Sequence, residues 1–383
     1  MKLAVIASHP VQYQAPLFRR LAAWEGLELV VFYAFLPDSS SQGEGFGVGF
    51  QWDIPLLEGY PHKIFAQGMA AGGGIARLPG AFFRLRQGLL SSRPDAILCT
   101  GWHHPAMVAG IAAAASTRRP LLLRCEANLL RDRPRGSRIF HRAMLSLYDA
   151  ALPIGVANRR YFSAFGIRQD QMFDSPYSIE NRRFADAAAG ADRAALRARW
   201  GIPPDAFCFL FAGKLVEKKH PATVVEAMRG LPGTHLLVVG SGALEASVRA
   251  AAETHRVGCS FAGFLNQSEI PAAYAAADCL VLPSDAGETW GLVVNEAMAC
   301  GLPAIVSDRV GCREDLIIDG ETGLSFPFGN TAALAEMLRA LASAPGLARE
   351  MGSKARSHIQ RWSVDNAAAG IVQAARAACA DRN

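Results

Sequence analysis

Short apolar runs alternate with segments of helical periodicity along most of the chain. In the first half, the runs that have the length of buried strands are Lys2–Ala7, Leu27–Tyr33, Ala96–Cys99, Leu121–Arg124 and Ala150–Pro153. Apolar residues recur with helical spacing over Pro16–Trp24, Leu78–Leu90 and Pro105–Ala115. Because parallel strands need crossover connections of this length, the alternation predicts a parallel sheet covered by helices.

The same alternation begins again in the second half. The predicted strands are Phe207–Phe211, Leu236–Val239, Cys279–Leu282 and Ala304–Val306. The predicted helices are Pro221–Met228, Ala243–Thr254 and Leu292–Cys300. The stretch Ser175–Phe184 between the two series is polar and lacks periodicity, which predicts a domain junction. We therefore expect an α/β fold of two Rossmann-like domains with parallel sheets, spanning residues 1–180 and 181–361.

The composition supports two packed domains and no membrane span. The chain has 383 residues, of which 51% are hydrophobic and 19% are charged. Apolar stretches such as Ala106–Ala115 reach only about half of the ~20 residues that a membrane helix needs. Met1–Ser8 lacks the length and the cleavage pattern of a secretory signal. The eight cysteines have no paired spacing, which predicts free buried thiols in a reducing cytoplasm.

The distribution of charge is more informative than its sum. The excess of 39 basic over 34 acidic residues gives a net charge of +5, which does not predict nucleic-acid binding. Basic residues nevertheless cluster over Arg131–Arg142, opposed in that stretch only by Asp132. This cluster is interpreted either as a solvated helix face or as a docking site for anionic lipid or for a phosphate-bearing acceptor.

Two glycine-rich stretches interrupt the first half, at Gln42–Phe50 and Gly68–Gly74. Glycine permits many backbone conformations, so such loops could move beside a binding site. Simple surface turns are the alternative for both stretches.

The segment Gly287–Pro303 has the strongest chemical signal. A strand ends at Leu282 and a helix opens near Gly291, so the free backbone N–H groups of Gly291, Leu292 and Val293 are predicted to form an anion site suited to a diphosphate. Glu296 lies about one turn inside this helix and could accept both hydroxyl protons of a ribose. Glu288 precedes the helix and could face a transferred sugar, whose positive charge in the transition state a carboxylate would stabilise.

A second loop is predicted at the same edge of the second sheet. The strand Phe207–Phe211 is followed by Gly213, Lys214 and Lys219, and two lysines there could neutralise a leaving diphosphate. Gly240 and Gly242 end the next strand and permit close approach of the backbone. A wall and backbone groups for a base could come from three successive residues, Gly263, Phe264 and Leu265.

Together, the Glu-x7-Glu segment, the Gly-Lys-Leu-Val loop, the run Phe261–Phe264 and the stretch Val310–Phe326 resemble the donor domain of retaining GT-B glycosyltransferases of family four. The resemblance covers about Phe207–Asn330. It implies that Glu288 lies beside the transferred sugar, that Glu296 holds the ribose, and that Lys214 and Lys219 bind the diphosphate. It also implies retention at the anomeric carbon and a C-terminal helix, within residues 362–383, that packs back on the first domain. Lys214 stands where arginine is more usual, which keeps the charge but loses the bidentate fork.

The first half resembles the family less closely, as expected for the acceptor side. The usual glycine-rich turn after the first strand is replaced by Ser8–Gln14, in which His9 is a candidate for acceptor contact. His103 and His104 lie in a segment similar to the one whose histidine contacts the sugar in the family, and His103 is favoured by its distance from Pro105. A core or capping role is the alternative for each histidine.

Two further candidates follow another predicted strand on the same side. Arg124 and Glu126 are candidates for the acceptor side, where Glu126 could orient an acceptor hydroxyl. Surface pairing of these two charges is the alternative.

The expected partners follow from these assignments. The chain has no Asp-x-Asp pair, so no metal and no further cofactor are expected, and the lysines and the helix start would neutralise the diphosphate. The donor is expected to be a UDP- or GDP-linked sugar. The acceptor is expected to be lipid-linked, a polysaccharide or a small molecule, in a cytoplasmic protein that either remains in solution or contacts an anionic membrane peripherally.

Two other functions remain open, a nucleotide-sugar epimerase of GT-B shape and a non-catalytic binding protein. A nicotinamide-dependent dehydrogenase is not expected, because the first strand is followed by His9-Pro10 and Glu245 stands where the third glycine of the fingerprint belongs.

Overall fold

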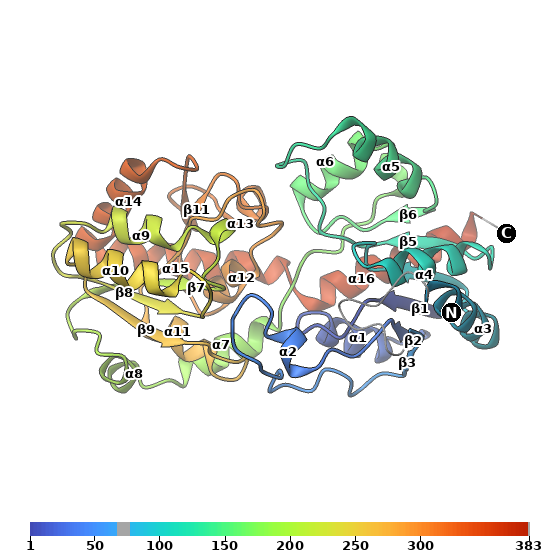
Figure 1. Ribbon diagram of the computed structural model, residues 1–383, viewed down its shortest axis with the longest axis horizontal. Coiled ribbons are helices and arrows are strands. Elements are labelled where there is room, and N and C mark those ends of the chain that lie inside the picture. Colours follow the sequence, from blue (N-terminus) through green and yellow to red (C-terminus); the bar gives the residue numbers. More distant parts are fainter. Residues whose placement is uncertain (67–76, 382–383) are drawn as a thin grey trace. The chain divides into compact units, whose positions relative to one another are not determined.

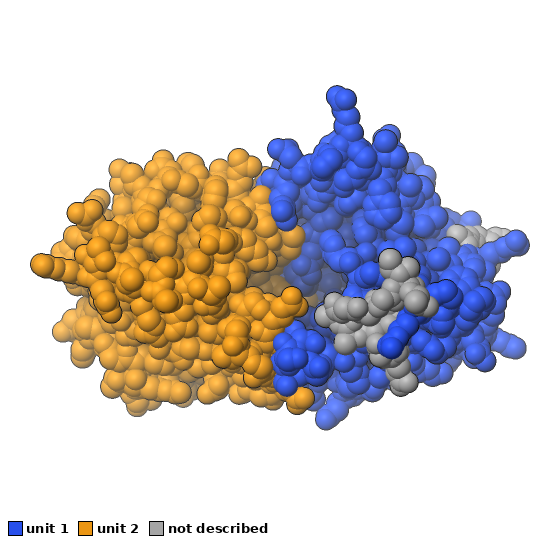
Figure 2. Space-filling model, viewed as in Figure 1, with its two compact units in different colours: residues 1–42, 54–177, 364–383 blue, residues 43–53, 178–363 orange. Residues whose placement is uncertain are grey.

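The computed structural model describes residues 1–66 and 77–381, so the stretch Gly68–Gly74 lies outside the described residues. The chain forms two compact units. Unit 1 comprises residues 1–42, 54–177 and 364–383, and unit 2 comprises residues 43–53 and 178–363 (Figure 2). The chain enters the main part of unit 2 at residue 178, close to the expected junction at 180, and returns to unit 1 at residue 364. The short segment 43–53 is the departure from the expected division.

Unit 1 contains a six-stranded parallel sheet in the order β3-β2-β1-β4-β5-β6 (Figure 1). The strands are β1 (Lys2–Ala7), β2 (Glu28–Tyr33), β3 (His62–Ile64), β4 (Ala96–Cys99), β5 (Leu121–Leu123) and β6 (Ala150–Ala151). The helices are α1 (Ala15–Ala22), α2 (Ser39–Gln42), α3 (Leu78–Ser92), α4 (Pro105–Ala115), α5 (Arg135–Leu145), α6 (Val156–Ala164) and α16 (Val364–Ala380).

Strand β1 shows why the strands of this sheet are continuous apolar runs in the sequence. Leu3 and Val5 belong to a core that also contains buried residues of α1 and α16. Ala4 and Ile6 belong to another core, which contains buried residues of α3, α4 and α6. Successive side chains point to opposite faces of a strand, so a strand covered on both faces must be apolar at every position.

Unit 2 contains a second six-stranded parallel sheet, in the order β12-β11-β10-β7-β8-β9 (Figure 1). The strands are β7 (Phe207–Ala212), β8 (Thr234–Val239), β9 (Cys259–Gly263), β10 (Cys279–Leu282), β11 (Ala304–Ser307) and β12 (Gly323–Phe326). The helices are α7 (Asn181–Ala189), α8 (Arg193–Arg199), α9 (Pro221–Ala227), α10 (Glu245–His255), α11 (Ile270–Ala276), α12 (Leu292–Ala299), α13 (Arg313–Leu316), α14 (Thr331–Ser343) and α15 (Pro345–His358). The two parallel sheets confirm the predicted α/β architecture.

The strand order of unit 2 fixes where a ligand would bind. From β7 the chain proceeds to β8 and β9 on one side and then returns to β10 on the other side of β7. The loops after β7 and β10 therefore diverge at a topological switch point, which is where open α/β sheets bind ligands.

Among residues 1–66 and 77–381, no helix is both long and apolar enough to cross a bilayer.

Candidate functional site

An ion pair links the two loops that meet at the switch point of unit 2. Lys219 follows β7 and Glu288 follows β10, and the ammonium group contacts the carboxylate with 12% and 13% of the two side chains exposed. The loops are also joined through their backbones, because the Asp285 N–H donates to the Lys218 carbonyl at 3.0 Å. The structure therefore brings together two of the residues that the sequence assigned to the site.

The loop that carries Glu288 is held by the segment after β11. The Gly311 N–H donates to the Glu288 carbonyl at 3.1 Å, and the Cys312 N–H donates to the Trp290 carbonyl at 2.9 Å. A Cβ at Gly311 would lie 1.9 Å from the Thr289 carbonyl oxygen, so the two segments approach this closely only because residue 311 is glycine. This bracing fixes the backbone from which the Glu288 side chain projects.

Helix α12 begins directly beyond this loop. Gly291 precedes it with φ of 104°, a left-handed conformation that favours glycine, and a Cβ there would lie 3.0 Å from Leu282 Cδ2. Leu292 and Val293 form the first turn, whose N–H groups have no intrahelical acceptor. The positive end of the helix dipole and these amides together can bind an anion.

Glu296 lies inside α12 and is fully buried. The hydroxyl of Tyr274 on α11, also fully buried, donates to Glu296 Oε2 at 2.6 Å. Sequence reasoning did not single out Tyr274. The assignment of Glu296 to a ribose stays a prediction.

Glycines shape the floor of the site between β7 and β8. Gly240 has φ of 116°, and a Cβ there would lie 2.0 Å from the Gly213 carbonyl oxygen. Gly242 is similarly constrained, because its Cβ would lie 2.5 Å from the Leu215 carbonyl oxygen. The close approach of the loop after β7 explains why residues 240 and 242, which follow β8, are glycines.

Lys214 is half-buried at this edge, in a positively charged neighbourhood. Burial lowers the pKa of its ammonium group, and the charges of Lys218 and Lys219 lower it further, while Glu44 opposes the shift. A doubly anionic ligand would offset this repulsion, since opposite charges favour the charged form.

Residues 43–53, which we call the docked segment, lie against the same edge of unit 2. Lys214 Nζ donates to the Glu44 carbonyl and lies 4.9 Å from the centre of the Phe46 ring. The Ser241 hydroxyl donates to the Phe46 carbonyl at 2.7 Å, and Asn266 Nδ2 donates to the Gln51 carbonyl at 2.7 Å. The glycine-rich stretch is thus neither a free loop nor a simple surface turn.

Aromatic rings complete the contact of the docked segment. Phe264 follows β9, and its ring centre lies 4.1 Å from that of Phe50 and 5.0 Å from that of Phe46. Gly263, one residue earlier, accepts a hydrogen bond from the Gly240 N–H at 2.7 Å. The predicted base-binding stretch, Gly263 to Leu265, therefore adjoins the rings of the docked segment.

In unit 1, two of the three candidate histidines gather around one aromatic ring. His9 stacks on Phe35 with ring centres 5.5 Å apart, and His104 lies 5.0 Å from the same ring. Burial lowers the pKa of His9, and the nearby His104 lowers it further. His104 Nδ1 also accepts the Ala106 N–H at 3.1 Å and so caps α4. His103, in contrast, is exposed; which of the two contacts a sugar stays a prediction.

Arg124 and Glu126 both contact Tyr177. Arg124 is buried, donates to the Ser175 hydroxyl at 3.0 Å, and has its guanidinium 5.2 Å from the ring centre of Tyr177. The Tyr177 hydroxyl donates to Glu126 Oε1. Arg124 is thus engaged within unit 1, where its contacts fix the segment that leads out to unit 2.

Residues 192–358 match the family model described as Glycosyl transferases group 1. The chain is 38% identical over 208 residues to a D-inositol 3-phosphate glycosyltransferase of Streptomyces bingchenggensis, covering 50% of this chain and 44% of that protein. It is 30% identical over 217 residues to a GDP-mannose-dependent monoacylated alpha-(1-6)-phosphatidylinositol monomannoside mannosyltransferase of Corynebacterium glutamicum, covering 54% and 56%. The chain thus spans about half the length of the curated relatives it matches.

The whole chain is similar in fold to solved structures. Anabaena Alr3699/HepE in complex with UDP superposes with a TM-score of 0.77 at 18% identity, covering 98% of this chain and 100% of that one. This likeness extends over both units and concerns the fold alone.

Proposed function

We propose that the protein transfers a sugar from a nucleotide-sugar donor to an acceptor, because residues 192–358 match the family model described as Glycosyl transferases group 1 and the chain has a GT-B fold. The observation that carries the proposal is the arrangement at the switch point of unit 2. Lys214 and Lys219 follow β7, and Glu288 follows the neighbouring strand β10 just before α12 begins. Lys219 and Glu288 form an ion pair there.

In this proposal, the cations bind the donor diphosphate. Lys214 and Lys219 neutralise its charge, and the first amides of α12 donate to its oxygens. The lysines and the helix start would serve in place of a bound metal. The donor would be a UDP- or GDP-linked sugar, because the similar HepE structure holds UDP while the Corynebacterium relative is named for GDP-mannose.

Glu288 would act on the transferred sugar. When the bond between the anomeric carbon and the diphosphate breaks, positive charge develops on the sugar, and a carboxylate held beside it stabilises that charge. The acceptor hydroxyl oxygen would then bond to the same face of the anomeric carbon and its proton would pass to the departing diphosphate, so that the carbon retains its configuration. Lys219 pairs with Glu288 where the two loops meet. Its ammonium group would turn from Glu288 toward the departing phosphate as negative charge develops there.

The acceptor is proposed to carry a phosphate group. The two curated relatives are named for an inositol 3-phosphate and for a phosphatidylinositol monomannoside, both of which contain phosphate. A lipid-linked or polysaccharide acceptor would place the protein in surface polysaccharide or glycoconjugate assembly, on the cytoplasmic side of a membrane. The eight free cysteines are consistent with that reducing compartment.

A panel of UDP- and GDP-sugars tests the proposal, with transfer to phosphorylated acceptors and slow donor hydrolysis as readouts. Glu288→Gln is expected to abolish both, whereas Glu253→Gln, at an exposed position of α10, is expected to leave both unchanged. Equal inertness of the wild type and Glu288→Gln with donors that bind would favour a non-catalytic binding protein. Turnover of the donor sugar into its epimer without an acceptor would favour the epimerase.

A further inference from the structure

Helix α5 of unit 1 contributes few side chains to the core. Of its residues Arg135–Leu145, only Leu145 is buried. Ile139 is 72% exposed and Phe140 is 47% exposed, although both are large apolar side chains. A helix this short is marginal in water unless an apolar face is packed. The exposed face of α5 therefore lacks the burial that would ordinarily stabilise such a helix.

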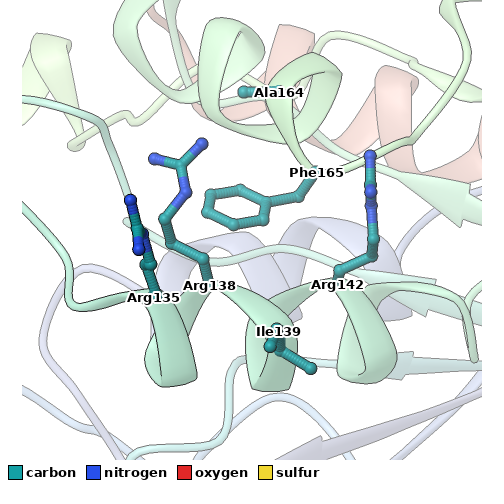
Figure 3. A pocket seen from close by; sticks show the side chains of 6 residues that line it. All are labelled: Arg135, Arg138, Ile139, Arg142, Ala164 and Phe165. Carbon is teal, nitrogen blue, oxygen red and sulfur yellow. The ribbon is translucent and has the colours of Figure 1, made fainter.

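Three arginines adjoin this exposed apolar face. Arg135, Arg138 and Arg142 are spaced as i, i+3 and i+7, which places them on one side of the helix. With Ile139 and the end of α6 they line a depression of about 350 Å³, in which the guanidinium groups of Arg138 and Arg142 flank the ring of Phe165 (Figure 3). The Arg138 guanidinium lies 5.5 Å from the centre of that ring.

The charges of these three arginines are not neutralised within the part of the chain that the structure describes. None of them forms an ion pair with a described carboxylate, whereas Arg159 of the adjacent helix α6 pairs with Asp174. Three cations and exposed apolar side chains on one short helix are the composition of a segment that lies in the plane of a membrane interface.

We propose that α5 docks on an anionic lipid bilayer. The guanidinium groups of Arg135, Arg138 and Arg142 bind headgroup phosphates, and Ile139 and Phe140 enter the boundary between headgroups and acyl chains. A soluble phosphate ester would satisfy the arginines but would leave Ile139 in water, whereas a bilayer satisfies both. This surface is distinct from the edge of unit 2 and does not depend on the proposed transfer reaction.

Helix α3 provides an internal comparison. It exposes Phe83 (66%) and Leu90 (48%) beside a depression that Arg86 also lines, but it presents a single arginine there. Apolar exposure alone is therefore similar on the two helices, and the cationic cluster distinguishes α5.

Vesicle flotation of the full chain tests the proposal. The wild type is expected to bind vesicles of phosphatidylcholine mixed with phosphatidylglycerol, to bind pure phosphatidylcholine weakly, and to dissociate as salt is raised. The triple variant Arg135→Gln/Arg138→Gln/Arg142→Gln is expected to lower the partition coefficient roughly a hundredfold, since each arginine contributes about fivefold near an anionic surface. Ile139→Ser/Phe140→Ser is expected to lower it roughly tenfold or more.

The control variant is Phe83→Ser/Arg86→Gln on α3, which is expected to bind as the wild type does. The substituted side chains are exposed, except Arg86, which is half-buried, and circular dichroism checks that each variant is folded. Equal vesicle binding by the wild type and the triple variant would overturn the proposal. The proposal would also be overturned if the wild type bound no vesicles but bound inositol phosphate, and the triple variant lost that binding. Donor hydrolysis, measured on the same variants, reports separately on the proposed transfer reaction.

Discussion

The ammonium group of Lys219 lies against the carboxylate of Glu288, with little of either side chain exposed to water. The two residues are far apart in sequence, and they meet because β7 and β10 are neighbours in the sheet. Where water is largely excluded, an ion pair depends strongly on both partners, since removal of one leaves the other charge uncompensated. The pair is therefore both a stabilising contact and the place where the loops of the site are joined.

Replacement of one partner should cost more than replacement of both. Lys219→Met is expected to lower the free energy of unfolding by about 3 kcal/mol, because the Glu288 carboxylate loses its counter-charge. The double variant Lys219→Met/Glu288→Gln is expected to recover more than half of that loss. Urea unfolding of the two single variants and the double variant gives the coupling energy. Purely additive losses would mean that the pair contributes no interaction energy.

Gly240 should not tolerate a side chain. In Gly240→Ala, the new Cβ would meet the Gly213 carbonyl oxygen at 2.0 Å, so one of the two strand ends must shift. A loss of about 3 kcal/mol in the free energy of unfolding is expected. Gly230→Ala is the matched control, because Gly230 also has positive φ but has open space around its Cβ, and about 1 kcal/mol is expected there. Equal losses at both sites would attribute the effect to φ alone.

The docked segment should depend on its aromatic rings. Phe46→Ala/Phe50→Ala removes the two rings nearest to Phe264, which is expected to lower the free energy of unfolding by about 2 kcal/mol. Cleavage after Glu44 by a glutamate-specific protease should become faster, because the backbone around it is less firmly held. Phe83→Ala, at an exposed ring of α3, is expected to change neither quantity measurably. An unchanged cleavage rate in the double variant would show that the hydrogen bonds alone retain the segment.

The sequence predicted the sheets more completely than the site. Strands such as β1, β4 and β10 are buried on both faces and therefore read as continuous apolar runs. Strand β9 has no fully buried position, so its sequence lacks such a run and it was not predicted. The docked segment could not be predicted from periodicity, because its contacts with Lys214, Ser241 and the Asn266 side-chain amide are made by backbone carbonyl groups, which any residue carries. The available signals were Phe46, Phe50 and Trp52 in an otherwise glycine-rich stretch, and Asp53, whose carboxylate accepts from the Ser268 N–H.

Acidification should destabilise unit 1 through His9. Its pKa is lowered in the folded protein by burial and by His104, so below about pH 6.5 the unfolded chain takes up a proton that the folded protein resists. The contribution of His9 to stability is therefore complete above that pH and declines as the pH falls toward its folded pKa. His104→Asn keeps a side-chain acceptor for the start of α4 but removes the second charge. Imidazole titration by NMR is expected to show a higher His9 pKa in this variant; an unchanged value would leave burial as the sole cause.

The Tyr274 hydroxyl donates a hydrogen bond to Glu296 Oε2, and its removal should affect both stability and donor binding. Both side chains are fully buried, so Tyr274→Phe leaves a carboxylate oxygen without this donor and is expected to cost about 2 kcal/mol of unfolding free energy. If Glu296 holds the donor ribose, a carboxylate free to turn also binds it less well. KM for the donor should then rise about tenfold with a smaller change in kcat, because the ribose contact is the same in the ground state and the transition state.

Tyr33→Phe is the matched control for this effect. It removes a buried hydroxyl that contacts the Tyr60 hydroxyl at 2.7 Å in unit 1, so it should cost a similar stability while leaving KM unchanged. A loss of stability in Tyr274→Phe with an unaltered KM would restrict Tyr274 to folding and would remove support for the ribose contact of Glu296. A rise in KM in Tyr274→Phe alone would instead identify Tyr274 as the residue that positions the carboxylate, since general loosening of the protein would affect both variants.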